Sequence, residues 1–157
     1  MIRPTTPDDS AAVIALVVAA GMFPANETDV VDNMLADYFG RNINDGHVCV
    51  IDEEAEPVGI AYYAPAPATD RTWYLTMIGI RPDYQGRGRG ASLLRHVENA
   101  LQASGQRVLL VETSGLPSYE RTRAFYMKCG YEEEARIRDF WAAGDDMVVF
   151  RKALNAE

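Results

Sequence analysis

The sequence predicts a single domain of α/β or α+β class, in which helices pack on one central sheet. Its length of 157 residues suits one domain that folds without metals or disulfides. Apolar residues recur with helical spacing in some segments and form short strand-like runs in others. The order is strand, two helices, three antiparallel-type strands, helix, strand, helix and two strands. We therefore expect residues 1–157 to form one domain around one sheet.

The first half of the chain predicts a short strand, two helices and a hairpin. After a strand over residues 2–4, Thr6 is expected to cap a helix and Asp9 to complete a capping box. This helix runs to about Gly21, and a second begins near Asn26 or Thr28 and ends before Gly40. Residues 47–52 and 57–64 then predict the two strands of the hairpin.

The second half predicts four strands and two helices. A strand over residues 73–80 precedes a helix with one apolar face, which Gly105 closes. Residues 107–113 form an apolar strand that we expect to be covered on both faces. Ser118 is expected to cap a helix over residues 119–129. Residues 131–141 and 147–152 predict the last two strands.

Alternating glycines join the strand over residues 73–80 to the helix that follows it. Because Gly86, Gly88 and Gly90 lack a β-carbon, their backbone can turn sharply and direct successive N–H groups into one concavity. The start of the helix adds unpaired donors and the positive end of its dipole. Arg87 and Arg89 add formal charge. The loop therefore predicts a pyrophosphate cradle.

Other interpretations of this loop are less consistent with its residues. No Gly-x-x-x-x-Gly-Lys-Ser/Thr string occurs, which excludes a Walker P-loop. A dinucleotide-binding Gly-x-Gly-x-x-Gly fingerprint fits the spacing poorly, although Glu112 lies downstream on the next strand. A surface loop whose glycines only turn the chain remains an alternative at this point.

Charge is distributed unevenly along the chain. The formal net charge of −8 argues against nucleic acid as a partner. Residues 1–56 carry −9 and the remainder +1, while residues 81–96 carry +3. The basic segment suits an anionic ligand. The acidic half favours a cationic partner or is simply a solvated acidic face.

Metal, disulfide and membrane signals are missing from the sequence. Cys49 and Cys129 lack metal-ligand spacing, so we expect two reduced thiols and no metal site. The start of the chain has no leader-like pattern, and no apolar stretch approaches the roughly 18 residues of a membrane span. We expect a cytoplasmic protein with no membrane partner.

Two motifs resemble those of the GNAT superfamily, the acetyl-CoA-dependent N-acyltransferases. The segment Gln85-Gly86-Arg87-Gly88-Arg89-Gly90 is similar to the family's cofactor signature. The segment Phe125-Tyr126 to Gly130-Tyr131 resembles the Phe-Tyr-x-x-x-Gly-Phe pattern of its last helix. The resemblance implies a mostly antiparallel sheet of about seven strands with about four helices, splayed between strands four and five.

The resemblance also implies how acetyl-CoA, the co-substrate, would bind. Main-chain groups of Ile78 and Ile80 would bond to the pantetheine arm as an added strand does. Gly79 would mark a bulge that permits the splay, or would only allow close packing. Backbone N–H groups would hold the pyrophosphate, leaving Arg87 and Arg89 free to screen it or the ribose phosphate; these groups belong to Gln85, Gly86, Arg87, Gly88, Arg89, Gly90 and Ala91.

In this family an amine attacks the thioester directly, and the resemblance assigns the proton transfers. Tyr126 would reprotonate the leaving thiolate, and an N–H at or near Ile78 would stabilise the carbonyl oxygen. Glu112 is expected to be a partly buried base with a raised pKa, or a structural carboxylate bonded to a neighbour. Tyr119 stands where many members have an asparagine that contacts the cofactor, so it would reach the cofactor itself or the segment would be reorganised.

The expected activity is transfer of an acetyl group to a primary amine of a small molecule or peptide. The acceptor side would comprise residues 22–39 and the final strands, including the acidic residues Glu27, Asp29, Asp32 and Asp37. The alternatives are a non-catalytic acyl-CoA sensor on the same fold and a dinucleotide-binding oxidoreductase. Dimers are frequent in the family, so a homodimer is one expected state.

Overall fold

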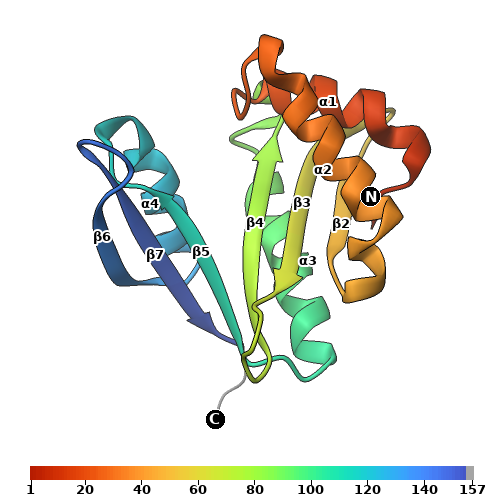
Figure 1. Cartoon of the computed structure of the whole chain (residues 1–157). Coiled ribbons are helices and arrows are strands. Elements are labelled where there is room, and N and C mark those ends of the chain that lie inside the picture. Colours follow the sequence, from red (N-terminus) through yellow and green to blue (C-terminus); the bar gives the residue numbers. More distant parts are fainter. Residues whose placement is uncertain (155–157) are drawn as a thin grey trace.

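A computed structural model describes residues 1–154 and shows one seven-stranded sheet in the order β1-β2-β3-β4-β5-β7-β6 (Figure 1). All neighbouring strands are antiparallel except β4 and β5. The elements are β1 (Ile2–Pro4), α1 (Ser10–Ala19), α2 (Thr28–Gly40), β2 (Val48–Glu53), β3 (Pro57–Pro65), β4 (Thr72–Ile80), α3 (Arg89–Ala103), β5 (Val108–Ser114), α4 (Glu120–Lys128), β6 (Glu132–Ala142) and β7 (Asp145–Ala153). The predicted fold class is confirmed.

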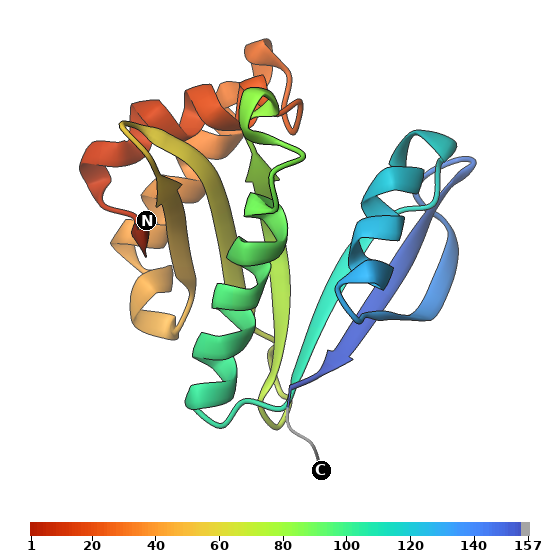
Figure 2. The same cartoon turned by 180° about the vertical axis from the view of Figure 1, so that it is seen from behind.

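Helices cover both faces of the sheet. Helices α1 and α2 lie on one face, and α3 and α4 lie on the other, as the two opposite views show (Figures 1 and 2). Val13 and Leu35 anchor the core under α1 and α2. Leu93 and Phe150 belong to the core under α3 and α4. Within residues 1–154, no helix is both long and apolar enough to cross a membrane.

Strands β4 and β5 separate after a short parallel contact. They pair only from Thr72 with Val108 to Leu75 with Val111. Beyond that point, β5, β7, β6 and α4 diverge from the rest of the molecule, so that the two halves form a V (Figure 1). The predicted splay is confirmed, and Thr76 and Glu112 are the first residues of its two unpaired edges.

The bulge in β4 lies at Thr76, not at Gly79. Tyr62 pairs with Met77 and Tyr63 pairs with Leu75, so Thr76 is the extra residue, whereas Gly79 pairs regularly with Ile60. A β-carbon at Gly79 would lie 2.3 Å from the sulfur of Met22. The expected bulge at Gly79 is therefore wrong, and close packing against the segment between α1 and α2 accounts for the glycine.

The two predicted N-caps have different outcomes. The capping box of Thr6 and Asp9 is confirmed, and the Thr6 N–H donates to the Asp9 carboxylate over 2.8 Å. Ser118 does not cap a helix. A 3₁₀ turn over Pro117–Tyr119 begins after Leu116, and α4 starts only at Glu120. The fixed φ of proline suits the first position of a helical turn, so Pro117 starts that turn before Ser118.

Candidate functional site

The glycine loop is open and its backbone is left-handed at two positions. Gly86 has φ 75° and Gly88 has φ 80°, and Gly88 is the N-cap of the 15-residue helix α3. No heavy atom lies within 4 Å of a β-carbon built at either glycine. The N–H groups of the first helical turn have no partner within the helix and point out of its start. This backbone fits an anionic group such as a pyrophosphate.

Gln85 has a different role from the expected one. Its main-chain N–H donates to the Pro82 carbonyl over 3.2 Å, within a turn. Its side-chain amide donates to the Ile80 carbonyl over 2.8 Å. Gln85 therefore fastens the loop to the end of β4 and does not offer its own N–H to a ligand. The available N–H groups begin with Gly86.

Ile78 and Ile80 lie on the β4 edge that β5 has left. On its other side β4 stays paired, Ile78 with Ala61 and Ile80 with Gly59. Pairing with β5 ends at Leu75, so residues 76–80 have no strand on the β5 side. Such an edge can accept an extended ligand through its main chain. The Ile80 carbonyl is excluded from this role because it already accepts the Gln85 amide.

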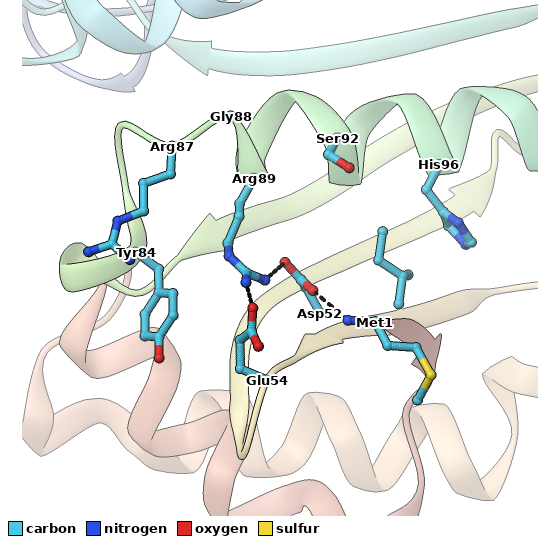
Figure 3. Close-up of a pocket in the computed structure, with 10 residues that line it drawn as sticks. Met1, Asp52, Glu54, Tyr84, Arg87, Gly88, Arg89, Ser92 and His96 are labelled. Carbon is cyan, nitrogen blue, oxygen red and sulfur yellow. Dashed lines mark hydrogen bonds and ion pairs between the residues drawn. The ribbon is translucent and has the colours of Figure 1, made fainter.

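The two arginines of the loop are not equivalent (Figure 3). Arg89 donates from Nη1 to the Asp52 carboxylate over 2.8 Å and forms an ion pair with Glu54. It is therefore held against β2 and the turn after it, and the expectation that it stays free is wrong. Arg87 forms no ion pair within residues 1–154, and its guanidinium carbon lies 5.4 Å from the centre of the Tyr84 ring. Only Arg87 remains as a free cation of the loop in that part of the chain.

A cavity of about 710 Å³ lies beside these arginines, between α3 and the strands β1 and β2 (Figure 3). Its walls mix both charges; the residues are Met1, Ile2, Asp52, Glu54, Tyr84, Arg87, Gly88, Arg89, Ser92 and His96. It shares no lining residue with a second, smaller cavity, which lies where β4 and β5 separate.

Tyr126 is buried on the α4 side of the sheet. Its side chain is 4% exposed and packs on Phe150, with ring centres 5.6 Å apart. Burial raises its pKa well above the ordinary value, so the phenol stays protonated at neutral pH. Its hydroxyl has no hydrogen-bond partner within residues 1–154 and is available as a donor there.

The two sequence motifs meet in space. A β-carbon at Gly90 would lie 3.5 Å from the Phe125 ring, so the start of α3 contacts the residue next to Tyr126. This contact lies across the two halves of the V. The structure thereby brings the glycine loop and the Phe-Tyr motif to one place, although 36 residues separate Gly90 from Tyr126 in the sequence.

Glu112 is exposed, so its expected partial burial is wrong. Its carboxylate forms no hydrogen bond or ion pair with residues 1–154, which also disagrees with a structural carboxylate bonded to a neighbour. Val111 belongs to the same core cluster as Tyr126. Because successive strand residues alternate between faces, Glu112 and Tyr126 lie on opposite faces of the sheet.

Glu112 lines a cavity of about 300 Å³ at the splay. The other lining residues are Ala64, Tyr74, Leu75, Thr76 and Trp141. Of these, only Trp141 belongs to a segment expected on the acceptor side, the strand over residues 131–141. The indole N–H of Trp141 donates to the Thr113 carbonyl over 3.3 Å, which holds the ring at β5. The acidic residues of α2 and its preceding turn do not line this cavity.

The segment after β5 is held by other groups than the family's asparagine. Arg123 donates to the carbonyls of Ser114 and Leu116, each over 2.8 Å. The Ser114 hydroxyl donates to Asp145 over 2.5 Å. Tyr119 is exposed and its hydroxyl has no hydrogen-bond partner within residues 1–154. The segment is thus fixed by Arg123 and Ser114, and the expected contact of Tyr119 with the cofactor stays a prediction.

An open strand edge, a helix start whose N–H groups are free and a buried tyrosine are together the features of an acyl-CoA-dependent acyltransferase. The model of the GNAT acetyltransferase domain matches residues 44–133, which is more than half of the chain. This protein belongs to the GNAT acetyltransferase family, whose co-substrate is acetyl-CoA.

Solved structures agree with this assignment. A protein from Desulfovibrio desulfuricans assigned to the GNAT family is 32% identical, with 99% of both chains covered and a TM-score of 0.91. An acetyltransferase from Salmonella typhimurium, solved with acetyl-CoA, is 20% identical over 100% of this chain and 95% of its own, with a TM-score of 0.79. The ribosomal-protein-S18-alanine N-acetyltransferase of Escherichia coli is 20% identical over the same shares, with a TM-score of 0.80. No curated protein sequence matches the chain.

Proposed function

We propose that this protein is an N-acetyltransferase that transfers the acetyl group of acetyl-CoA to a primary amine by direct attack. The observation that carries the proposal is the separation of β4 and β5 after Leu75 and Val111. The separation leaves an open edge that leads from the glycine loop to a hollow lined by Glu112. Acetyl-CoA supplies the activated acyl group as a thioester.

The residues of the open half hold the co-substrate in this proposal. The N–H groups of Gly86 to Ala91 bind the pyrophosphate, and Arg87 adds a positive charge. The edge over residues 76–80 binds the extended arm through its main chain. The Ile78 N–H is the donor proposed for the carbonyl oxygen as negative charge develops there.

Proton transfers are divided between the two faces of the sheet. Glu112 accepts a proton from the incoming ammonium group on the exposed face, directly or through water. Tyr126 donates its hydroxyl proton to the departing sulfur on the buried face. A phenol is a weaker acid than a thiol by roughly 1.5 pKa units in water, and burial raises the pKa of Tyr126 further, so this donation requires a site that destabilises the departing thiolate still more. The amine and the thiol therefore use opposite sides of one opening.

Two glycines at the ends of the same helix provide a matched test of the cradle. Gly88 and Gly105 have φ values of 80° and 78°, and both have open space around them. Gly88→Ala and Gly105→Ala therefore add the same backbone strain of about 1 kcal/mol. Calorimetry should show that only Gly88→Ala weakens binding of coenzyme A by tenfold or more. Equal affinities in the two variants would contradict the cradle.

Catalysis is tested separately by thiol release from acetyl-CoA over a panel of primary amines. Turnover with any amine would support the proposed N-acetyltransferase activity. Binding of acetyl-CoA without turnover on the whole panel would instead support the alternative, a non-catalytic acyl-CoA sensor on this fold. Membership of the GNAT family leaves the dinucleotide-binding oxidoreductase without support, and titration with NAD(H) should show no binding.

A further inference from the structure

The cavity at the splay is lined by one carboxylate and otherwise by uncharged side chains. Of the six residues that line its 300 Å³, one is a carboxylate, two are aromatic, and the others are Ala64, Leu75 and Thr76. Glu112 is the only charged group in this wall. Its volume is at the lower end of the roughly 300–1,000 Å³ of small-ligand pockets. The cavity therefore suits a small ligand with one positive charge.

Trp141 is brought to the cavity by an irregularity in β6. The register of β6 against β7 shifts between Ile137 and Ala142, so the residues between them leave the ladder. Asp139 has φ 57° in this segment. It is held by two hydrogen bonds: its N–H donates to Asp146 over 3.0 Å, and its carboxylate accepts the Gly144 N–H over 2.8 Å.

The indole of Trp141 is fixed but half-exposed. It donates to the Thr113 carbonyl, and the Phe140 ring meets it edge to face with centres 4.7 Å apart. Nevertheless, 47% of Trp141 is accessible. Aromatic faces bind both organic cations and apolar groups, and a fixed ring does so with little loss of conformational entropy.

We propose that the acceptor is a small monocationic primary amine whose substituent is aromatic or apolar; this inference rests on the proposed function. The ammonium group pairs with Glu112, and the substituent lies against Trp141 and Tyr74. A polyamine or an aminoglycoside carries several positive charges, for which this wall offers one carboxylate. The acidic residues Glu27, Asp29, Asp32 and Asp37 are exposed elsewhere and do not line the cavity.

The first experiment measures kcat/KM for 2-phenylethylamine, isoamylamine, spermidine, kanamycin and a peptide with N-terminal alanine. We expect 2-phenylethylamine and isoamylamine to exceed the other three by at least tenfold. Equal values, or a preference for spermidine, kanamycin or the peptide, would overturn the inference while leaving an N-acetyltransferase in place.

The second experiment uses the two tryptophans of the chain and does not require turnover. Trp73 packs in the core under α3 and donates to the side-chain carbonyl of Gln106 over 2.8 Å, and it does not line the cavity. In Trp73→Phe, 2-phenylethylamine added to the coenzyme A complex should quench the remaining Trp141 fluorescence. In Trp141→Phe, the emission of Trp73 should not change. Saturable quenching in both variants, or in neither, would overturn the inference.

A third measurement separates recognition from folding. Trp141→Ala should raise the KM for 2-phenylethylamine at least tenfold, change the KM for methylamine less than twofold, and leave the melting temperature nearly unchanged. An equal rise in KM for both amines would assign Trp141 a general structural role and contradict recognition of the substituent. If no amine is turned over by the wild type, the proposed function fails. The fluorescence titration still shows whether 2-phenylethylamine binds beside Trp141.

Discussion

Arg89 donates a hydrogen bond to Asp52 over 2.8 Å, which fastens the start of α3 to the end of β2. The Asp52 side chain is only 9% exposed, so this pair is better shielded from water than a surface salt bridge. Arg89 follows the last left-handed glycine of the loop, so this contact ties the loop to a strand that is distant in the sequence.

Asp52→Asn should weaken coenzyme A binding without changing the chemistry of turnover. Loss of the charge loosens Arg89 and leaves the helix start less well placed. We expect the dissociation constant to rise about threefold to tenfold, or about 0.6–1.4 kcal/mol, while kcat stays unchanged. Calorimetry and initial rates measure the two quantities. Asp8→Asn, at an exposed carboxylate, is the control; a lower melting temperature with unchanged affinity would assign Asp52 to stability alone.

Tyr126→Phe should lower kcat by about 10²-fold to 10⁴-fold, because the variant cannot donate a proton. The affinity for acetyl-CoA should stay within twofold, since the ring that fills the core is kept. Tyr63→Phe is the matched control: Tyr63 is 3% exposed, and burial raises its pKa to about 12. A comparable loss of kcat in both variants, or no loss in Tyr126→Phe, would argue against Tyr126 as the proton donor.

Gly79→Ala should destabilise the fold by about 1–3 kcal/mol, because the new methyl group overlaps the Met22 sulfur. The double variant Gly79→Ala, Met22→Ala should lose less unfolding free energy than the sum of the losses in the two single variants. Urea unfolding measures all three variants. Gly40→Ala has open space and should change stability by less than about 0.5 kcal/mol. Additive effects of the two changes would show that Met22 is not what Gly79 accommodates.

Stability should fall as the pH is lowered from about 4 to 2, in part through Asp9. The Arg3 guanidinium holds the pKa of Asp9 at about 2, below its ordinary value of 3.8. Because the folded pKa is the lower one, the pair's contribution is complete above the unfolded pKa and is lost on acidification. Asp9→Asn should lower the free energy of unfolding by about 2 kcal/mol at pH 7 and should reduce its dependence on pH between about 4 and 2. Urea midpoints from pH 2 to 7, with Asp8→Asn as control, check the prediction; an unchanged slope in Asp9→Asn would contradict it.

The fold and the glycine turn at the start of α3 could be predicted because their signals are local. Glycine spacing, apolar periodicity and the capping box at Thr6 each depend on residues within a few positions of one another. Family resemblance then added the splay, which no periodicity shows. Gly79 was ambiguous because a bulge and a close contact require the same residue.

The misjudged residues depend on contacts distant in the sequence. Arg89 is paired with Asp52, 37 positions away, and no local pattern indicates that partner. The exposure of Glu112 follows from the divergence of β4, since a paired and covered strand would have buried it. Trp141 reaches the cavity only because β6 slips against β7 beyond Ile137. Such a register shift is set by the Asp139 and Asp146 hydrogen bonds and leaves no periodic signature.

The edge that β4 presents after Leu75 consists of amide and carbonyl groups that every residue except proline can offer. Side chains along this stretch are therefore free to change while the main chain keeps its capacity for an extended ligand. Thr76 stands both on this edge and in the wall beside Glu112. Substitutions of these side chains can therefore change which acceptor fits beside Glu112, while the main chain keeps its capacity to bind an extended co-substrate.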